Sequence, residues 1–254
     1  MTGDEDRLLS EQVAFYEADA IGMNGFLVQL VDPANGTTDA VSYRAGRQWL
    51  VSFLAERAPL GRVLEIAAGG GLVAELVAPL AEAVDLLDSS DQALQLARSR
   101  LEPFGNKLRY LLADIFEFEP EDHYDLIYFT AWLHHVPRRR LAEFWRLVDR
   151  CLSPDGWVLF DFPETAEWGL SADEAPSSPE EGYAAYRPDQ DISVRDVDGR
   201  RWTVVHVLWD QGALSDELER CGWTMKVERR GAGFFTWATA RRTDGATRRT
   251  GRGD

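Results

Sequence analysis

The chain has 254 residues, of which 45% are hydrophobic, so it can bury a complete core within one domain. Its formal net charge is −16 and its basic cluster is confined to residues 241–254, which predicts that the protein does not bind nucleic acid. The first residues are polar and no apolar run is long enough to span a bilayer. We therefore expect a cytoplasmic protein without a signal peptide or membrane contact, with Cys151 and Cys221 as reduced thiols.

Residues 1–57 are predicted to form a helical cap over one end of a sheet. Apolar periodicity indicates helices at about 6–20 and 40–56, joined by the turn-rich sequence DPANGTTD. We expect residues 58–241 to form the main domain and residues 242–254 to be a disordered tail.

From residue 60 onward, short apolar runs alternate with segments of helical period, which is the pattern of βαβ units around a parallel sheet. The helices are expected near residues 71–81, 90–103 and 138–152. The five strands are expected at residues 62–67, 83–88, 108–114, 124–129 and 156–162.

The pattern changes after the fifth strand, where residues 163–208 are predicted to form an inserted lid and β-hairpin. Residues 171–190 are acidic and aperiodic and are expected to be a loop, whereas Asp198-Gly199 predicts a hairpin turn. A helix at 210–221 and the antiparallel strands TMKVERR and FFTWATAR follow. The fold class is therefore α/β: a doubly wound, mostly parallel seven-stranded, Rossmann-like sheet with a helical cap and an inserted hairpin.

The sequence VLEIAAGGG is an apolar strand that runs into glycines and then into a helix. Gly69 and Gly71 allow the backbone to turn sharply and approach a ligand just beyond the first strand, where open α/β sheets bind ligands. Together with Ala74 they also satisfy a dinucleotide fingerprint, so a NAD-binding oxidoreductase stays open here. Glu65 favours a different ligand, because its carboxylate would repel a pyrophosphate and attract a cationic cofactor such as S-adenosylmethionine.

Two further acids end successive strands. Asp88 ends the second strand, where a carboxylate can accept hydrogen bonds from both hydroxyls of a ribose. Asp114 follows the third strand, where it could accept from an adenine amino group while Ile115 packs against the ring. Each acid, Glu65 included, could instead be a turn residue, a helix cap or the partner of an Arg.

The fourth strand continues into FTAWLHHVP, which places Thr130, Trp132, His134 and His135 at the carboxyl edge of the sheet. A histidine there could accept a proton from a substrate hydroxyl, because its pKa is close to neutral pH. It could equally cap a helix or lie in the core. A metal site is not expected, because adjacent residues rarely point the same way and no third ligand has a suitable spacing.

These motifs resemble those of the class I S-adenosylmethionine-dependent methyltransferases over residues 10–241, and LHHVP is similar to the rim of bacterial small-molecule, natural-product methyltransferases. The resemblance implies S-adenosylmethionine as cofactor and S-adenosylhomocysteine as product. It implies that His135 lies close to the methionine end of the cofactor, so we predict His135, and next His134, as catalytic residues. Trp132 suits an apolar pocket and is predicted to contact the substrate. The cofactor contacts that it implies are Tyr16, Glu65, Ala67, Gly69, Gly71, Asp88, Ser89, Asp114, Ile115 and Thr130.

The chain departs from this family at two positions. Ala67 stands where many members have Gly, and Met23 stands where related enzymes often have a Tyr near the cofactor carboxylate. We expect methyl transfer to a small molecule, most simply to an oxygen of a secondary metabolite, by a monomer or homodimer. The alternatives are a cofactor-binding cyclase that does not transfer methyl, a NAD-linked oxidoreductase, and a non-catalytic regulatory protein.

Overall fold

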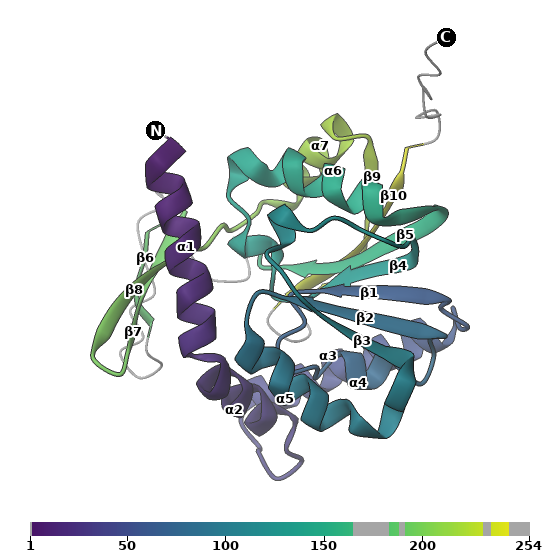
Figure 1. Ribbon diagram of the computed structural model, residues 1–254, viewed down its shortest axis with the longest axis horizontal. Coiled ribbons are helices and arrows are strands. Elements are labelled where there is room, and N and C mark those ends of the chain that lie inside the picture. Colours follow the sequence, from purple (N-terminus) through teal and green to yellow (C-terminus); the bar gives the residue numbers. More distant parts are fainter. Residues whose placement is uncertain (1, 165–182, 188–190, 231–234, 244–254) are drawn as a thin grey trace.

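The structure, a computed structural model, describes residues 2–164, 183–187, 191–230 and 235–243. A seven-stranded sheet runs through it in the order β3-β2-β1-β4-β5-β10-β9 (Figure 1). The first five strands in this order are parallel, β10 is antiparallel to β5, and β9 is antiparallel to β10. The predicted mostly parallel seven-stranded sheet is confirmed. The strands are β1 Arg62–Ile66, β2 Ala83–Asp88, β3 Leu108–Leu112, β4 Tyr124–Phe129, β5 Leu152–Phe162, β9 Trp223–Arg229 and β10 Thr236–Arg242.

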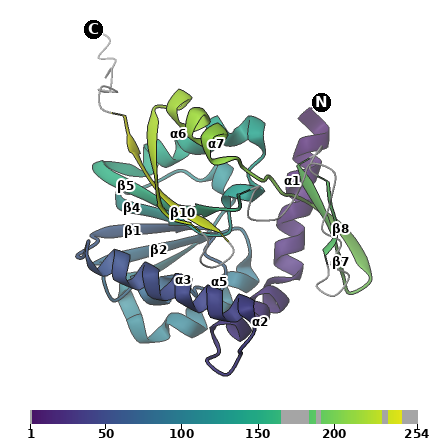
Figure 2. The same cartoon turned by 180° about the vertical axis from the view of Figure 1, so that it is seen from behind.

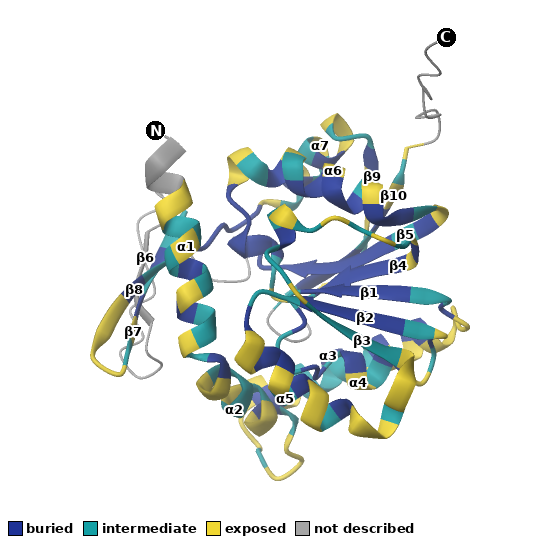
Figure 3. Ribbon diagram, viewed as in Figure 1, coloured by how far each residue is buried: buried dark blue, intermediate teal, exposed yellow. Residues whose placement is uncertain are grey.

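Helices cover both faces of this sheet (Figures 1 and 2). One face packs against α3 (Thr38–Ala55), α4 (Ala74–Val77) and α5 (Asp91–Leu101), and the other against α6 (Leu141–Cys151) and α7 (Gln211–Arg220). The central strands β1, β2 and β4 are almost entirely buried, as Figure 3 shows, which explains their continuous apolar sequences, whereas the edge strands β3 and β9 are only partly buried. The predicted helices at 71–81 and 138–152 are shorter than expected, since only α4 forms in the first and α6 follows a short 3₁₀ turn in the second.

Three N-terminal helices form where two were expected. They are α1 (Thr2–Ala18), α2 (Ala20–Val31) and α3, and α2 was missed because Gly22, Asn24 and Gly25 weaken the helical signal. α3 packs on the sheet face through Leu50, whereas α1 lies apart from that sheet, beside β8 (Figure 1). No helix in the described ranges has the length and apolar character needed to cross a bilayer. The domain boundary at residue 57 and the tail assignment for 242–254 stay predictions, and 244–254 lie outside the described residues.

A second, antiparallel sheet contains β6 (Tyr183–Arg187), β7 (Ile192–Val197) and β8 (Arg200–Val205) in that order. The predicted hairpin at Asp198-Gly199 is confirmed, because both residues have positive φ and Val197 pairs with Arg200. The loop prediction for 171–190 is wrong where β6 forms, because a strand of five residues between polar stretches has too little alternation to identify. The rest of that segment lies outside the described residues.

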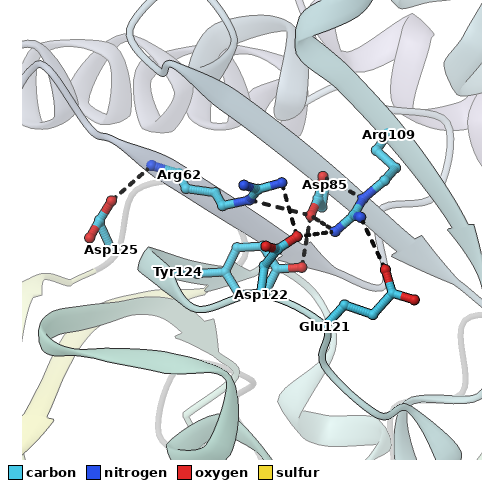
Figure 4. Close-up of polar contacts among 7 residues, drawn as sticks. All are labelled: Arg62, Asp85, Arg109, Glu121, Asp122, Tyr124 and Asp125. Atoms are coloured by element: carbon cyan, nitrogen blue, oxygen red, sulfur yellow. Dashed lines mark hydrogen bonds and ion pairs between the residues drawn. The ribbon is translucent and has the colours of Figure 1, made fainter.

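A charged cluster joins the first residues of β1, β2 and β4 to β3 (Figure 4). Asp85 is buried and accepts hydrogen bonds from Arg109 Nη2 at 2.6 Å, Arg109 Nε at 3.1 Å and the Tyr124 hydroxyl at 2.7 Å. Asp122 receives ion pairs from Arg109 at 2.9 Å and from Arg62 at 3.0 Å. The hydrogen bond and charge of Asp85 raise the pKa of Arg109, so the guanidinium stays charged. This cluster lies at the amino ends of the strands and leaves their carboxyl ends for a ligand.

Candidate cofactor and acceptor site

The strand order reverses between β1 and its neighbours β2 and β4, the place where open α/β sheets form a ligand crevice. A cavity of about 440 Å³ lies there, at the carboxyl ends of the strands, with walls from α1, α2, the loops after β1, β2, β3 and β4, and the second sheet. Among the predicted site residues, Gly71 is outside its lining. The others contribute to it: Tyr16, Glu65, Ala67, Gly69, Asp88, Ser89, Asp114, Ile115, Thr130, Trp132, His134 and His135.

The glycine loop has left-handed backbone at three positions. Ala67 has φ 55°, Gly69 φ 53° and Gly71 φ 73°. A Cβ at Gly69 would meet no atom within 4 Å, so this residue leaves open space for a ligand, whereas a Cβ at Gly71 would lie 2.8 Å from Leu101. Gly71 therefore serves close packing of the loop against α5. Ala67 adopts a conformation that favours glycine, which explains why Gly is frequent there in the family that the sequence resembles.

Asp88 lines the cavity and accepts hydrogen bonds from two backbone amides. One carboxylate oxygen accepts from the Gly69 amide at 2.8 Å and the other accepts from the Ser90 amide at 2.8 Å. Burial raises the pKa of Asp88, and the backbone amides lower it. A carboxylate has about four lone-pair positions, so both oxygens keep capacity for the two hydroxyls of a ribose.

Glu65 lies at the end of β1, is 2% exposed and lines the cavity. Its Oε2 has no hydrogen-bond partner among the described residues, and burial raises the pKa of the carboxyl group to about 8. The Tyr128 hydroxyl is close enough to lower that pKa, but a buried carboxyl oxygen without a partner is costly, so Oε2 marks a position where a cationic ligand group would be favourable. The residue types at this end of the cavity therefore fit S-adenosylmethionine.

The third strand supplies Asp114 and Ile115. One oxygen of Asp114 accepts from the Phe116 amide at 2.8 Å and caps a 3₁₀ turn at Ile115–Glu117. Ile115 is buried and offers an apolar surface to the cavity. Asp114 therefore caps a turn, which is one of the alternatives that the sequence left open, and it also lines the cavity.

The rim after β4 is held by an acid that the sequence did not single out. Ala131 has φ 49°, and its amide donates to Asp161 at 2.6 Å. Asp161 ends β5, is buried, and burial raises its pKa to about 7. This contact fixes the backbone between Thr130 and Trp132, which both line the cavity.

His135 makes hydrogen bonds through both ring nitrogens. Its Nδ1 lies 2.7 Å from the Val205 carbonyl oxygen, so Nδ1 carries the proton and donates it. Nε2 therefore accepts from the Tyr16 hydroxyl at 2.5 Å. Gln12, one turn before Tyr16, adds hydrogen bonds to the His135 carbonyl and the Val205 amide, so α1, the rim and β8 are tied together.

His134 is buried beside His135, with ring centroids 3.9 Å apart, and His206 lies 5.0 Å from His134. Burial lowers the pKa of all three imidazoles, and the positive charge of Arg195 lowers them further. The histidines are therefore neutral at physiological pH. Within the described part of the chain, no cluster of three or more His, Cys, Asp or Glu side chains is placed to ligate a metal.

Arg195 and His206 line the same cavity and were not among the predicted site residues. Arg195 lies on β7 of the second sheet and His206 directly follows β8, in a region that the sequence indicated only as an insertion. The alternation of ISVRDV carries a signal, because it places Ser193 and Arg195 on one strand face, and both prove to be buried. A charged residue on a buried strand face is unusual and indicates a site.

Comparisons with known proteins agree with this geometry. Residues 63–156 match a family model described as a methyltransferase domain. The chain is 29% identical to human N-terminal Xaa-Pro-Lys N-methyltransferase 1 over 149 residues, covering 56% of the chain and 66% of the relative. It is 33% identical to a ubiquinone biosynthesis O-methyltransferase of Thiobacillus denitrificans over 108 residues, covering 41% of the chain and 46% of the relative. The chain therefore spans just under two thirds of the length of the first relative and less than half of the length of the second.

Similar solved structures cover more of the chain. The DhpI–SAH complex aligns with a TM-score of 0.70 and 25% identity, covering 93% of this chain and 98% of that one. The CcbJ methyltransferase from Streptomyces caelestis aligns with a TM-score of 0.63 and 18% identity, covering 78% and 89%, and supports the fold alone. The fold and the site are thus those of a cofactor-binding α/β methyltransferase domain.

Residues 63–156 therefore match a methyltransferase domain, and the chain shares its fold with S-adenosylmethionine-dependent methyltransferases, for which S-adenosylmethionine is the cofactor and S-adenosylhomocysteine the product. Its relatives include methyltransferases for both nitrogen and oxygen acceptors.

Proposed function

We propose that this protein transfers a methyl group from S-adenosylmethionine to an oxygen of a small-molecule acceptor, such as a secondary metabolite. The observation that carries the proposal is a cavity lined at one end by Glu65, whose Oε2 has no hydrogen-bond partner among the described residues, and by Asp88, and at the other end by Tyr16 and the histidines. The Glu65 end suits a cationic cofactor and disfavours a pyrophosphate, which supports a methyltransferase over a NAD-linked oxidoreductase.

The bound cofactor supplies a methyl group on a cationic sulfur. Glu65 would face its positive charge, Asp88 would accept from its ribose, and Ile115 would pack against its adenine. At the other end, Trp132 and the rim would orient the acceptor and exclude water, since an in-line displacement depends mainly on alignment. These roles, and those of Ala67, Gly69, Ser89, Asp114 and Thr130, are proposals for the cofactor-bound protein.

The role of His135 as a general base stays a prediction. Its lone pair is occupied by the Tyr16 hydroxyl and its pKa is lowered, so we propose that it holds Tyr16 in position. His135→Asn should then reduce turnover by less than about 10²-fold with an unchanged pH–rate profile. A general base would instead cost roughly 10²–10⁴-fold and remove a pKa from that profile. His134→Asn is the matched control. His134 is equally buried, but the Tyr16 hydroxyl donates its hydrogen bond to His135.

The activity itself is tested by calorimetry with S-adenosylmethionine, S-adenosylhomocysteine and NAD, followed by a S-adenosylhomocysteine release assay on hydroxyl, acid and amine acceptors. Binding of the first two compounds and product release with an oxygen acceptor are expected. Tight NAD binding would refute the proposal. Release with amines alone would identify a nitrogen acceptor, the second candidate that the relatives support. Cofactor binding without any methylated product would favour the cyclase alternative.

A further inference from the structure

A buried arginine forms part of the acceptor end of the cavity. Arg195 lies on the inner face of β7, is 5% exposed, and lines the cavity together with Ser193 and His206. The second sheet that carries it packs against α1, where Phe15 contacts Trp202 and Gln12 accepts from the Val205 amide at 2.9 Å. The arginine is therefore placed by a packed layer and not by a loose loop.

Aromatic rings and one hydroxyl hold the guanidinium in place. Its central carbon lies 5.1 Å from the ring centroid of Phe15 and 5.8 Å from that of Tyr16, within the range of cation–π attraction. Nη1 donates to the Tyr16 hydroxyl oxygen at 3.4 Å. Because the Tyr16 proton is donated to His135, its oxygen presents lone pairs to Arg195. The fork of guanidinium donors is thus oriented before any ligand binds.

The positive charge of Arg195 lies at this end of the cavity and lowers the pKa of the neighbouring imidazoles. The imidazoles of His134, His135 and His206 are neutral for the reasons given above. Asp161 lines the same cavity, and Asp19 lies within range of the Arg195 charge. Burial raises the pKa of Asp161 to about 7, and it raises the pKa of Asp19 although the charge of Arg195 opposes this.

We infer that the acceptor is an oxyanion, a carboxylate or a phosphate-type group, whose charge is bound by Arg195 and whose oxygen receives the methyl group. This inference rests on the proposed function. Arginine binds oxyanions through paired, charge-assisted hydrogen bonds, and an ionised oxygen needs none of the neutral histidines as a base. The acceptor oxygen forms the new O–C bond while the C–S bond breaks, the electron pair of that bond stays on sulfur, and no proton moves. The acceptor loses one negative charge and the sulfonium loses its positive charge, and a water-poor cavity favours this loss of charge.

The test measures binding of three probes that differ in charge at one position: benzoate, phenylphosphonate and benzamide, each in the presence of S-adenosylhomocysteine. Calorimetry should show that benzoate or phenylphosphonate binds at least about tenfold more tightly than neutral benzamide. The tighter of the two anions identifies the kind of oxyanion. Equal binding of benzamide and both anions would overturn the inference.

Variants of two arginines on adjacent strands assign the effect. Arg195→Gln should remove the preference for the anion, and Arg195→Lys should retain part of it, because Lys keeps the charge but not the paired donors. Arg201→Gln is the matched control, since Arg201 on β8 has a side chain that is 74% exposed, and it should change probe affinity less than about twofold. An anion preference that survives Arg195→Gln would overturn the inference.

The affinity for S-adenosylhomocysteine separates the possible failures. Affinity within about twofold of the original protein shows that the Arg195 variants are folded and that loss of probe binding is local. Failure of the original protein to bind S-adenosylhomocysteine would overturn the proposed function itself. Binding of S-adenosylhomocysteine without selection of anions would overturn only the oxyanion acceptor.

Discussion

Glu65→Gln should remove the pH dependence that the Glu65 carboxyl group gives to the affinity for S-adenosylmethionine. In the empty cavity the pKa of Glu65 is about 8, because burial disfavours the charged form. A cationic ligand needs the ionised form, so binding at pH 7 includes the cost of deprotonation. One pKa unit corresponds to about 1.4 kcal/mol, and that is the cost at pH 7.

The magnitude follows from the ionised fraction. With a pKa of about 8, roughly 1% of Glu65 is ionised at pH 6 and half is ionised at pH 8. The ratio of the dissociation constants of Glu65→Gln and the original protein should therefore rise by up to about 50-fold between pH 6 and pH 8. The ratio is the useful quantity, because any titration of the cofactor itself affects both proteins equally. Calorimetry in buffers of different ionisation enthalpy should also show release of nearly one proton at pH 7.

The same group affects the stability of the empty protein with a definite sign. The pKa of Glu65 is raised on folding, so the folded state holds a proton that the unfolded state loses between about pH 4.5 and pH 8. Stability should fall as pH rises through that window, by about 4–5 kcal/mol at most from 1.36 kcal/mol per unit. Urea unfolding of Glu65→Gln should lack this fall. A flat affinity ratio together with an unchanged stability profile would refute the assignment of Glu65 as a protonated, cation-binding carboxyl group.

Three other substitutions test separate parts of the structure. Asp88→Asn should weaken S-adenosylmethionine binding in calorimetry by about 1.5–3 kcal/mol, the size of a hydrogen bond to a charged group, and unchanged affinity would exclude Asp88 from the ribose site. Ala67→Gly should stabilise the protein to urea by about 0.5–1 kcal/mol, because a left-handed alanine costs about 1–2 kcal/mol and the extra freedom of unfolded glycine offsets part of this. Ala68 does not have a left-handed backbone, so Ala68→Gly should instead destabilise the protein. Asp85→Asn should cost about 2–3 kcal/mol in unfolding free energy because it weakens a buried hydrogen-bonded cluster, while Glu121→Gln at its 84% exposed edge should stay within about 0.5 kcal/mol.

The cofactor end of the site could be predicted because its signals are local in sequence. A buried strand, a glycine loop and a helix are consecutive, Asp88 is the last residue of β2, and Asp114 lies shortly after β3. Parallel strands bring their carboxyl ends to one edge, so the positions of these acids in space follow from the order of the elements. The left-handed backbone of Ala67 was not predictable, because alanine carries no signal for positive φ.

At the acceptor end the sequence pointed to Tyr16, Trp132 and the two histidines, but Arg195, His206 and the contacts that join these residues were missed because they depend on pairings between distant segments. Gln12 contacts Val205 across 193 residues, and Tyr16 contacts His135 across 119. Neither contact has a periodicity that a window of sequence can reveal. Similarly, α2 contributes Met23 to the cavity wall, but its glycines conceal the helix.

This division explains why the comparisons identify the cofactor more readily than the acceptor. The matched methyltransferase domain, residues 63–156, contains Glu65, Asp88 and the rim histidines. Tyr16 and Arg195 lie outside it, on α1 and on the second sheet. Tyr16 contacts the rim through its hydrogen bond to His135, and Arg195 contacts Tyr16 through a hydrogen bond and a cation–π interaction. A shared domain can therefore hold the same cofactor in relatives that methylate different atoms, while the added layer sets which acceptor charge is accepted. Since α1 and β8 are joined through Gln12 and His135, changes in this layer can alter the acceptor end without moving the strands that form the cofactor end.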